Sequence, residues 1–270
     1  MVKKLFQYEF KSYLRTLIPV NLILLAIAVF ARLIQFFETD SIPYMLLFGS
    51  SISAYGISIM VALILTGITV VVRFYKNLFT AEGYLTFTLP VTATQHILIK
   101  LFTGFLVETI TTVSVFLSAM IITSGDVLVE LFKATGYILK SVFMLELSGH
   151  IVFFAVEILL NMIVSSLFQT IVLYTCIALG QRSSKNRILM AVVYYFAYYM
   201  ISQAVSTVLT IIFTVIAETD LMEAIAEIFI NHPFGTIHTV SILSLLATAG
   251  LGVLGFFIIK KTIEHRLNLE

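Results

Sequence analysis

The sequence has 270 residues, of which 60% are hydrophobic and 11% are charged, and its formal net charge is +1. A soluble domain of this size needs a more polar surface, so the composition excludes one and predicts a protein that crosses a membrane several times. The near-neutral charge excludes the basic footprint of a nucleic-acid-binding protein.

The N-terminal 16 residues have the pattern of an amphipathic helix. Phe6, Phe10, Tyr13 and Leu17 recur at helical spacing, and basic residues occupy much of the other face. We expect an interfacial elbow helix over 1–16, lying in the membrane plane with its basic side toward anionic headgroups. The alternative is an ordinary positively charged flank of the first span. The start lacks the short apolar core and cleavage site of a signal peptide, so none is expected.

The rest of the chain contains six apolar stretches of about 20 residues or more, the length that a helix needs to cross a bilayer. The predicted fold is therefore an all-α membrane protein that forms a single transmembrane domain over 1–270. Residues 126–150 are expected to form a surface or re-entrant helix, and 218–235 a short outer helix that ends near Pro233 and Gly235. The predicted spans are 17–37, 44–72, 97–123, 151–180, 188–217 and 236–259.

The distribution of basic residues predicts the orientation of these spans. With the N-terminus inside, an even number of spans also places the C-terminus inside, and the outer segments hold only Lys133 and Lys140. This asymmetry is the one that the positive-inside rule describes. The inner segments then hold Lys3, Lys4, Lys11, Arg15, Arg73, Lys76, Lys100, Arg182, Lys185, Arg187, Lys260, Lys261 and Arg266.

The connector between the second and third spans, residues 73–96, is expected to be cytoplasmic. Phe74 and Leu78 are four residues apart, as are Tyr75 and Phe79, so a short helix would carry an aromatic face that Gly83 ends. Thr92 and Gln95 fit a capping box that starts the third span. A short surface helix is marginal alone, and aromatic residues are favoured interface anchors, so the pattern indicates docking of a separate protein.

The connector resembles the cytoplasmic loop of membrane-spanning permease subunits of the type-two exporter class of ABC transporters. In that family an acid and a glycine precede a Thr-Pro-Val-Ser-like stretch and a lysine, and here the segment reads EGYLTFTLPVTATQHILIK. It departs from the family because Glu82 and Gly83 are adjacent and Thr86 stands where a second acid is usual. The residues that carry the resemblance are Glu82, Gly83, Leu85, Leu89, Pro90, Val91, Thr92, Ile97 and Lys100.

The resemblance implies the membrane subunit of an ATP-driven exporter in a bacterial plasma membrane. It implies two partners: cytosolic ABC ATPase subunits, which bind ATP and Mg, and a second permease that is a copy or a related chain. The permease itself would bind no cofactor and hydrolyse no ATP, and the sequence lacks a Walker A motif. A hydrophobic or amphipathic substrate suits the aromatic interior. The implied ATPase-coupling residues are Arg73, Phe74, Tyr75, Lys76, Asn77, Leu78, Phe79, Glu82 and Gly83.

Three ionisable residues fall at membrane depth, where such groups usually face protein or water. Arg32 and Glu157 match in depth, which suggests an ion pair between the first and fourth spans; alternatively Arg32 extends outward to Glu38, Asp40 or lipid. Glu108 either lines a substrate path or is neutral and hydrogen-bonded at a helix contact.

Tyrosines cluster early in the fifth span as two i, i+4 pairs, Tyr194 with Tyr198 and Tyr195 with Tyr199. They line a substrate path or form an interfacial aromatic belt. The stretch 181–187 is a second inner loop that orients the chain or also contacts the ATPase.

Other patterns favour structural roles. The G-x-G-x-x-G at 250–255 lies inside an apolar span, so helix packing is favoured over cofactor binding. Glu146 and His150 lack the ligand set of a metal site, so no metal is expected. Cys176 lies in an apolar stretch and is expected to have only a packing role.

A different class of function stays open. The chain would then be a motor-independent secondary transporter with Glu108 as its proton site, or a structural membrane subunit of an envelope complex. An intramembrane enzyme is disfavoured because the sequence shows no nucleophile–base pair and no metal-ligand constellation.

Overall fold

The computed structural model confirms the predicted all-α fold. No strand occurs among the residues that it describes, and the element order is α1, α2, α4, α6, α7 and α9. The described residues are 2–37, 39–80, 82–83, 88, 90–123, 129–130, 133–134, 136–137, 151–183, 186–216, 227, 231 and 233–266.

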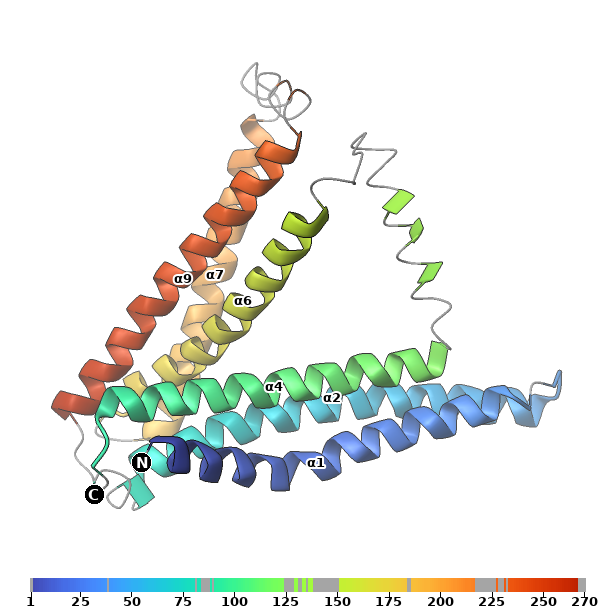
Figure 1. The fold of residues 1–270 in the computed structure, drawn as a ribbon, viewed down its shortest axis with the longest axis horizontal. Helices are drawn as coiled ribbons and strands as arrows, with labels where there is room; N and C mark the ends of the chain where they lie inside the picture. The colour runs from blue at the N-terminus through green and yellow to red at the C-terminus, as the bar shows by residue number, and fades with distance from the viewer. Residues whose placement is uncertain are drawn as a thin grey trace. The chain divides into compact units, whose positions relative to one another are not determined.

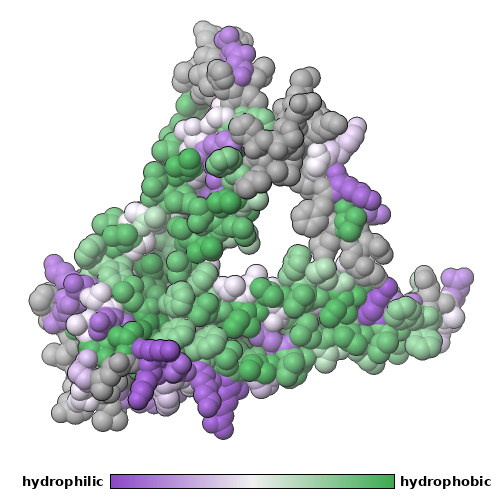
Figure 2. Space-filling view, viewed as in Figure 1, coloured by the Kyte–Doolittle hydropathy of each residue, from purple (hydrophilic) through white to green (hydrophobic). Residues whose placement is uncertain are grey.

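Six helices are long and apolar enough to cross a membrane, which indicates a multi-pass membrane protein. Hydrophobic side chains cover most of their exposed surface, whereas hydrophilic side chains gather over the N-terminal part of α1 (Figure 2). Bilayer-facing helices need this inversion of the usual surface pattern. The helices are α1 (Val2–Gln35), α2 (Ile42–Phe79), α4 (Ala93–Thr123), α6 (Ile151–Gly180), α7 (Arg187–Ile216) and α9 (Pro233–Arg266).

The chain divides into two compact units, Met1–Val142 and Phe143–Glu270, rather than packing as one. The first unit contains α1, α2 and α4, and the second contains α6, α7 and α9 (Figure 1). Each unit has its own set of helix–helix contacts.

In the first unit, α1 packs along α4 and α2 (Figure 1). The prediction of a separate elbow helix over 1–16 differs from the structure, because α1 is one 34-residue helix with Pro19 inside it. The predicted apolar face explains the difference: Tyr13 and Leu17 are buried within the unit, so this face packs against the chain's own helices. At 1.5 Å per residue α1 is about 51 Å long, well beyond the roughly 30 Å of a hydrocarbon core.

The structure of the connector differs from the prediction where the connector leaves α2, and agrees with the prediction where α4 begins. The helix predicted around Phe74–Phe79 is not separate from the second span, because α2 continues for 38 residues to Phe79. The capping box of α4 is confirmed: the Thr92 amide donates to Gln95 Oε1 at 3.1 Å, and the Gln95 amide donates to Thr92 Oγ1 at 3.3 Å.

In the second unit, α6 and α9 pack along each other and α7 contacts α6. Glycines permit the close approach of α9, because a Cβ at Gly255 would lie 2.7 Å from Ile171 Cγ2. This confirms the packing interpretation of the glycine motif. None of the α7 residues is buried.

Two predicted outer segments lie largely outside the described residues. Most of 126–150 and of 218–232 is not described. Pro233 and Gly235, where the outer helix was expected to end, are the first and third residues of α9. Proline is well suited to the first helical turn because its missing amide hydrogen would have no partner there.

Candidate functional site

Polar and charged residues of the first unit gather where α1, α2 and α4 meet, at the end that carries the exposed lysines of α1. We call Glu9, Ser12, Arg73, Asn77 and Lys100 the polar junction. Lys100 Nζ lies 2.7 Å from Glu9 Oε1, and Asn77 Nδ2 donates to the same oxygen at 3.0 Å. Glu9 is 5% exposed and Lys100 is 1% exposed. One α1 carboxylate therefore links all three helices.

Arg73 makes the second set of contacts in the junction. Its guanidinium donates to Ser12 Oγ, to the Ser12 carbonyl at 2.7 Å and to Thr16 Oγ1 at 3.3 Å. It also lies 4.7 Å from the centroid of the Tyr13 ring. The planar guanidinium suits such forked hydrogen bonding and stacking, which a lysine could not reproduce. Arg73 thus fixes one full turn of α1 against the end of α2.

Burying these charges is costly unless each is paired and hydrogen-bonded. The junction meets that condition, and it lies where α1 and α2 exceed the length that a bilayer requires. The exposed face of the same α1 segment carries Lys3, Lys4, Lys11 and Arg15. The arrangement can hold three helix ends together mechanically, and any force on the connector would reach α1 as well as α2 and α4.

The structure corrects the prediction of an aromatic docking face on the connector. Phe74 and Leu78 are fully buried and Phe79 is 8% exposed, with the Phe74 and Phe79 rings in edge contact. They are core residues because α2 stays helical to Phe79 and turns this side toward α1 and α4. Tyr75 is half-buried, so the described residues 73–80 present no continuous aromatic surface outward.

The exposed coupling candidates are charged. Lys76 lies on the outer side of the last turns of α2, and Glu82 is exposed in the turn that follows. Gly83 brings the chain back onto α2: its amide donates to the Thr80 carbonyl at 2.8 Å, and a Cβ would lie 2.7 Å from the Leu78 carbonyl oxygen. Glycine is thus required there by close approach. Leu85, Thr86 and Leu89 of the family pattern lie outside the described residues.

Sequence reasoning missed Glu9 and Ser12. The signal for Glu9 is that it is the one acid among the first 16 residues, on the side of the helix that also carries Tyr13. An acid on the apolar side of a basic helix needs a cationic partner, and Lys100 supplies it.

The ionisable residues at membrane depth have partners within their own units. Arg32 donates to Gln35 Oε1 and to the Ile122 carbonyl at 3.4 Å, and lies 5.0 Å from the centroid of the Phe36 ring. Glu157 Oε1 lies 2.8 Å from His238 Nδ1. The Arg32–Glu157 pair stays a prediction, and the contacts of both residues give no support to it.

A polar face extends along α7 at membrane depth. Tyr195, Tyr199, Gln203, Ser206, Thr210 and Thr214 recur every three or four residues, so they share one side of the helix. Every one of them is exposed. The opposite side is aliphatic, with Ile201, Val205, Val208 and Ile212.

Two hydroxyls of this face are satisfied within α7 itself. Thr210 and Thr214 each donate to the carbonyl four residues earlier, at 2.9 Å. The Gln203 amide makes no side-chain hydrogen bond within the described part of the chain. A lipid-facing glutamine is unfavourable. The face therefore suits water or another protein surface better than lipid.

The remaining predicted path residues fall on both units. Tyr195 and Tyr198 have ring centroids 6.5 Å apart, Tyr199 is exposed, and Tyr194 is half-buried. Glu108 is half-buried on α4 in the first unit. The structure thus groups the tyrosines on one helix and leaves their relation to Glu108 a prediction.

No cluster of three metal-ligating side chains occurs among the described residues, and Glu146 and His150 lie outside them. Cys176 is buried, as expected of a packing residue. No protein-family model, curated protein or solved structure matches the chain. The resemblance to exporter permeases therefore stays a prediction.

Proposed function

We propose that this chain is the membrane subunit of an ATP-driven ABC exporter. It moves a hydrophobic or amphipathic substrate, and a separate cytosolic ATPase supplies the energy. The polar junction is the observation that carries the proposal. A connector between two spans can transmit a push only if its base is rigidly fixed, and Glu9 and Arg73 fix that base to α1.

The contact with the ATPase is made by charges rather than by aromatic rings. Lys76 and Glu82 flank the end of α2 and are exposed, whereas Phe74 and Leu78 form the core beneath them. Opposite charges on one short connector favour a specific register on a charged partner surface. The polar face of α7 supports the transport part of the proposal, because it gives an amphipathic molecule a polar track across the bilayer.

Co-purification tests the proposal. The tagged full chain is expressed in its own organism in the plasma membrane, purified in mild detergent, and assayed for Mg-ATP hydrolysis. A stoichiometric, ATP-hydrolysing partner is expected to elute with the wild-type chain and to be lost with the variant that carries both Lys76→Glu and Glu82→Lys. The matched control is Lys4→Glu, an exposed charge on α1 away from the connector.

Two outcomes would reject the proposal. One is a wild-type chain that elutes without an ATPase. The other is substrate flux in ATP-free vesicles that Glu108→Gln abolishes, which would establish the secondary-transporter alternative. The elution position of each variant in detergent checks that loss of the partner is not loss of the fold.

A further inference from the structure

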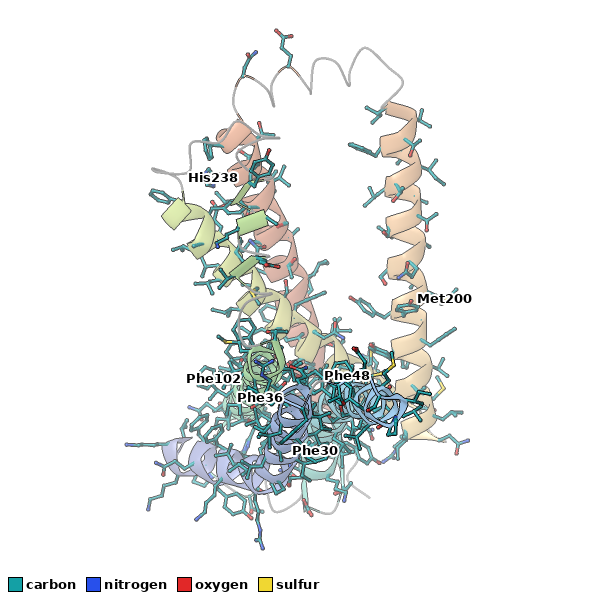
Figure 3. All side chains as sticks on the ribbon, turned by 90° about the vertical axis from the view of Figure 1, so that its right-hand side faces the viewer. Phe30, Phe36, Phe48, Phe102, Met200 and His238 are labelled. Atoms are coloured by element: carbon teal, nitrogen blue, oxygen red, sulfur yellow. The ribbon has the colours of Figure 1, made fainter. Side chains whose placement is uncertain are left out.

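The second unit contains a pocket of about 670 Å³ between the first halves of α6 and α9. Figure 3 shows these two helices side by side, with His238 near the start of α9. The volume lies within the usual range of small-molecule sites, roughly 300–1,000 Å³. The lining residues are Phe154, Ile158, Asn161, Met162 and Ser165 of α6, with Thr236, Ile237, Val240, Ser241 and Ser244 of α9.

The polar side of the pocket is organised by Asn161. Its amide nitrogen donates to the Glu157 carbonyl and to Ser241 Oγ, both at 3.0 Å, and its Oδ1 accepts from Ser244 Oγ at 3.2 Å. Both amide hydrogens are thus used and the oxygen keeps one lone pair. The amide is therefore fixed in orientation, with acceptor capacity left over.

Two hydroxyl groups in the same pocket have donor capacity left over. Among the described residues, neither Ser165 nor Ser241 donates its hydroxyl hydrogen to an acceptor. Most other serines and threonines of these helices donate to their own backbone, as Thr239 and Thr248 do. Unused donors are costly at hydrocarbon depth, where no bulk water can satisfy them. The pocket therefore calls for a ligand with an oxygen acceptor.

The absence of ionised side chains among the lining residues favours a neutral ligand. None of the lining residues is ionised, and the nearest ionisable groups, Glu157 and His238, are paired with each other at 2.8 Å. The depth of Asn161 along α6 excludes an ordinary phospholipid as the ligand whose polar group binds there. Asn161 is ten residues into α6, which is about 15 Å along the helix axis, and an ionic headgroup placed there would lose its hydration.

We propose that this pocket binds a long-chain neutral lipid taken from the bilayer, one that carries a hydroxyl or carbonyl group. Its polar group hydrogen-bonds Ser165, Ser241 and Asn161 Oδ1. Its chain lies against Phe154, Ile158, Met162, Ile237 and Val240. The binding deepens the proposed function by naming a ligand class and a site for it. It does not require the ATPase, so the two proposals can fail independently.

The chain has no tryptophan, which allows a single introduced reporter. Phe154→Trp places the indole in the pocket wall, and Phe153→Trp, at the same depth but outside the lining residues and 69% exposed, is the matched control. Each full-length variant is reconstituted into phosphatidylcholine bilayers with increasing mole fractions of a monoacylglycerol that has a dibrominated acyl chain. Bromine quenches tryptophan on contact.

We expect the fluorescence of the Phe154→Trp variant to be quenched at a mole fraction at least five-fold lower than that of the Phe153→Trp variant, and to saturate. Adding Ser165→Ala and Ser241→Ala should return the pocket reporter to the control curve. Dibrominated phosphatidylcholine should quench both reporters equally. Identical curves for the two reporters with the monoacylglycerol would overturn the proposal, as would a pocket curve that the serine changes leave unmoved. Unchanged elution in detergent shows that the variants fold.

Discussion

The two three-helix units are fastened in different ways. In the first, a buried ion pair and an arginine tie α1 to α2 and α4 at one end of the helices, and neutral hydrogen bonds such as Asn21–Thr111 lie further along. In the second, α6 and α9 are joined by the Glu157–His238 contact near the start of both helices, by neutral hydrogen bonds at Asn161, and by glycine contacts at Gly252 and Gly255. The difference reflects the surroundings of each contact: water lies close to the charged contacts, and hydrocarbon surrounds the neutral ones.

Charged fasteners are tolerable where helices extend past the hydrocarbon and water remains close by. Within the hydrocarbon there is no hydrophobic drive between helices, so small residues and neutral hydrogen bonds hold them together. Within the described part of the chain, no ion pair or side-chain hydrogen bond joins α7 to another of the six helices beyond its first turns, and all its residues remain at least partly exposed. The comparison thus distinguishes three features: the polar junction at one end of the first unit, the α6–α9 contact of the second unit, and α7, most of whose surface remains exposed.

Removing the cation of the polar junction should cause the largest loss. Lys100→Met leaves the Glu9 carboxylate buried without its counter-ion, and we expect about 3–5 kcal/mol of destabilisation. Unfolding in denaturing detergent, followed by circular dichroism, measures the loss. Lys4→Met, an exposed lysine of α1, should stay within about 0.5 kcal/mol of wild type.

The double change Glu9→Leu with Lys100→Met sharpens this test. It removes both charges and should recover most of the stability, because an apolar pair of similar volume can replace a buried ion pair. If the single and double variants were equally unstable, packing rather than charge would hold this end of the unit.

The sequence predicted what local patterns determine. All six helices contain the predicted spans nearly in full, because hydrophobic length is a local property, and the Thr92–Gln95 capping box depends on residues only three apart. The polar junction joins residues 91 positions apart, so no periodicity could reveal that Glu9 pairs with Lys100.

Two residues, Glu157 and Phe74, show how far reasoning from local pattern reaches. Glu157 was matched by depth to Arg32, yet His238 lies at the same depth in the parallel helix α9, six residues in against seven in α6. Phe74 was assigned to an exposed face because its helix was assumed to be short. Which side of a helix is buried depends on its tertiary neighbours, and these were not visible in the connector alone.

The glycine seam of the second unit should respond with opposite signs at two positions. Gly255→Ala places a Cβ 2.7 Å from Ile171 Cγ2 and should cost about 1–3 kcal/mol through overpacking. Gly250→Ala meets nothing within 4 Å and should be neutral or stabilising by up to about 1 kcal/mol, since alanine favours helix. The same unfolding assay measures both, and equal effects would contradict the close α6–α9 contact.

A smaller loss is expected from the neutral hydrogen bonds of that seam. Asn161→Leu removes the bonds to Ser241 and Ser244, and interhelical hydrogen bonds in membranes average about 0.6 kcal/mol with a maximum near 1.7. Thr248→Val removes a hydroxyl that bonds only to its own helix and should change stability less. A loss at Asn161 as large as that at Lys100 would erase the distinction between the two kinds of fastener.

Cysteine substitutions on α7 should have almost no effect on stability, and their labelling should show which side of the helix is accessible to water. Gln203→Cys and Ile201→Cys, each made in a Cys176→Ala background, sit on the polar and aliphatic sides of α7 at nearly the same depth. Neither side chain is buried within the chain, so unfolding should move by less than about 0.5 kcal/mol for both. A membrane-impermeant maleimide should label the Gln203→Cys variant in intact membranes and leave the Ile201→Cys variant unlabelled, because the reagent and the thiolate both need water. Labelling of neither would show that the polar face is sealed by protein. Equal labelling of both would show that α7 is surrounded by water on all sides, and the division of this helix into a polar track and a lipid-facing side would be wrong.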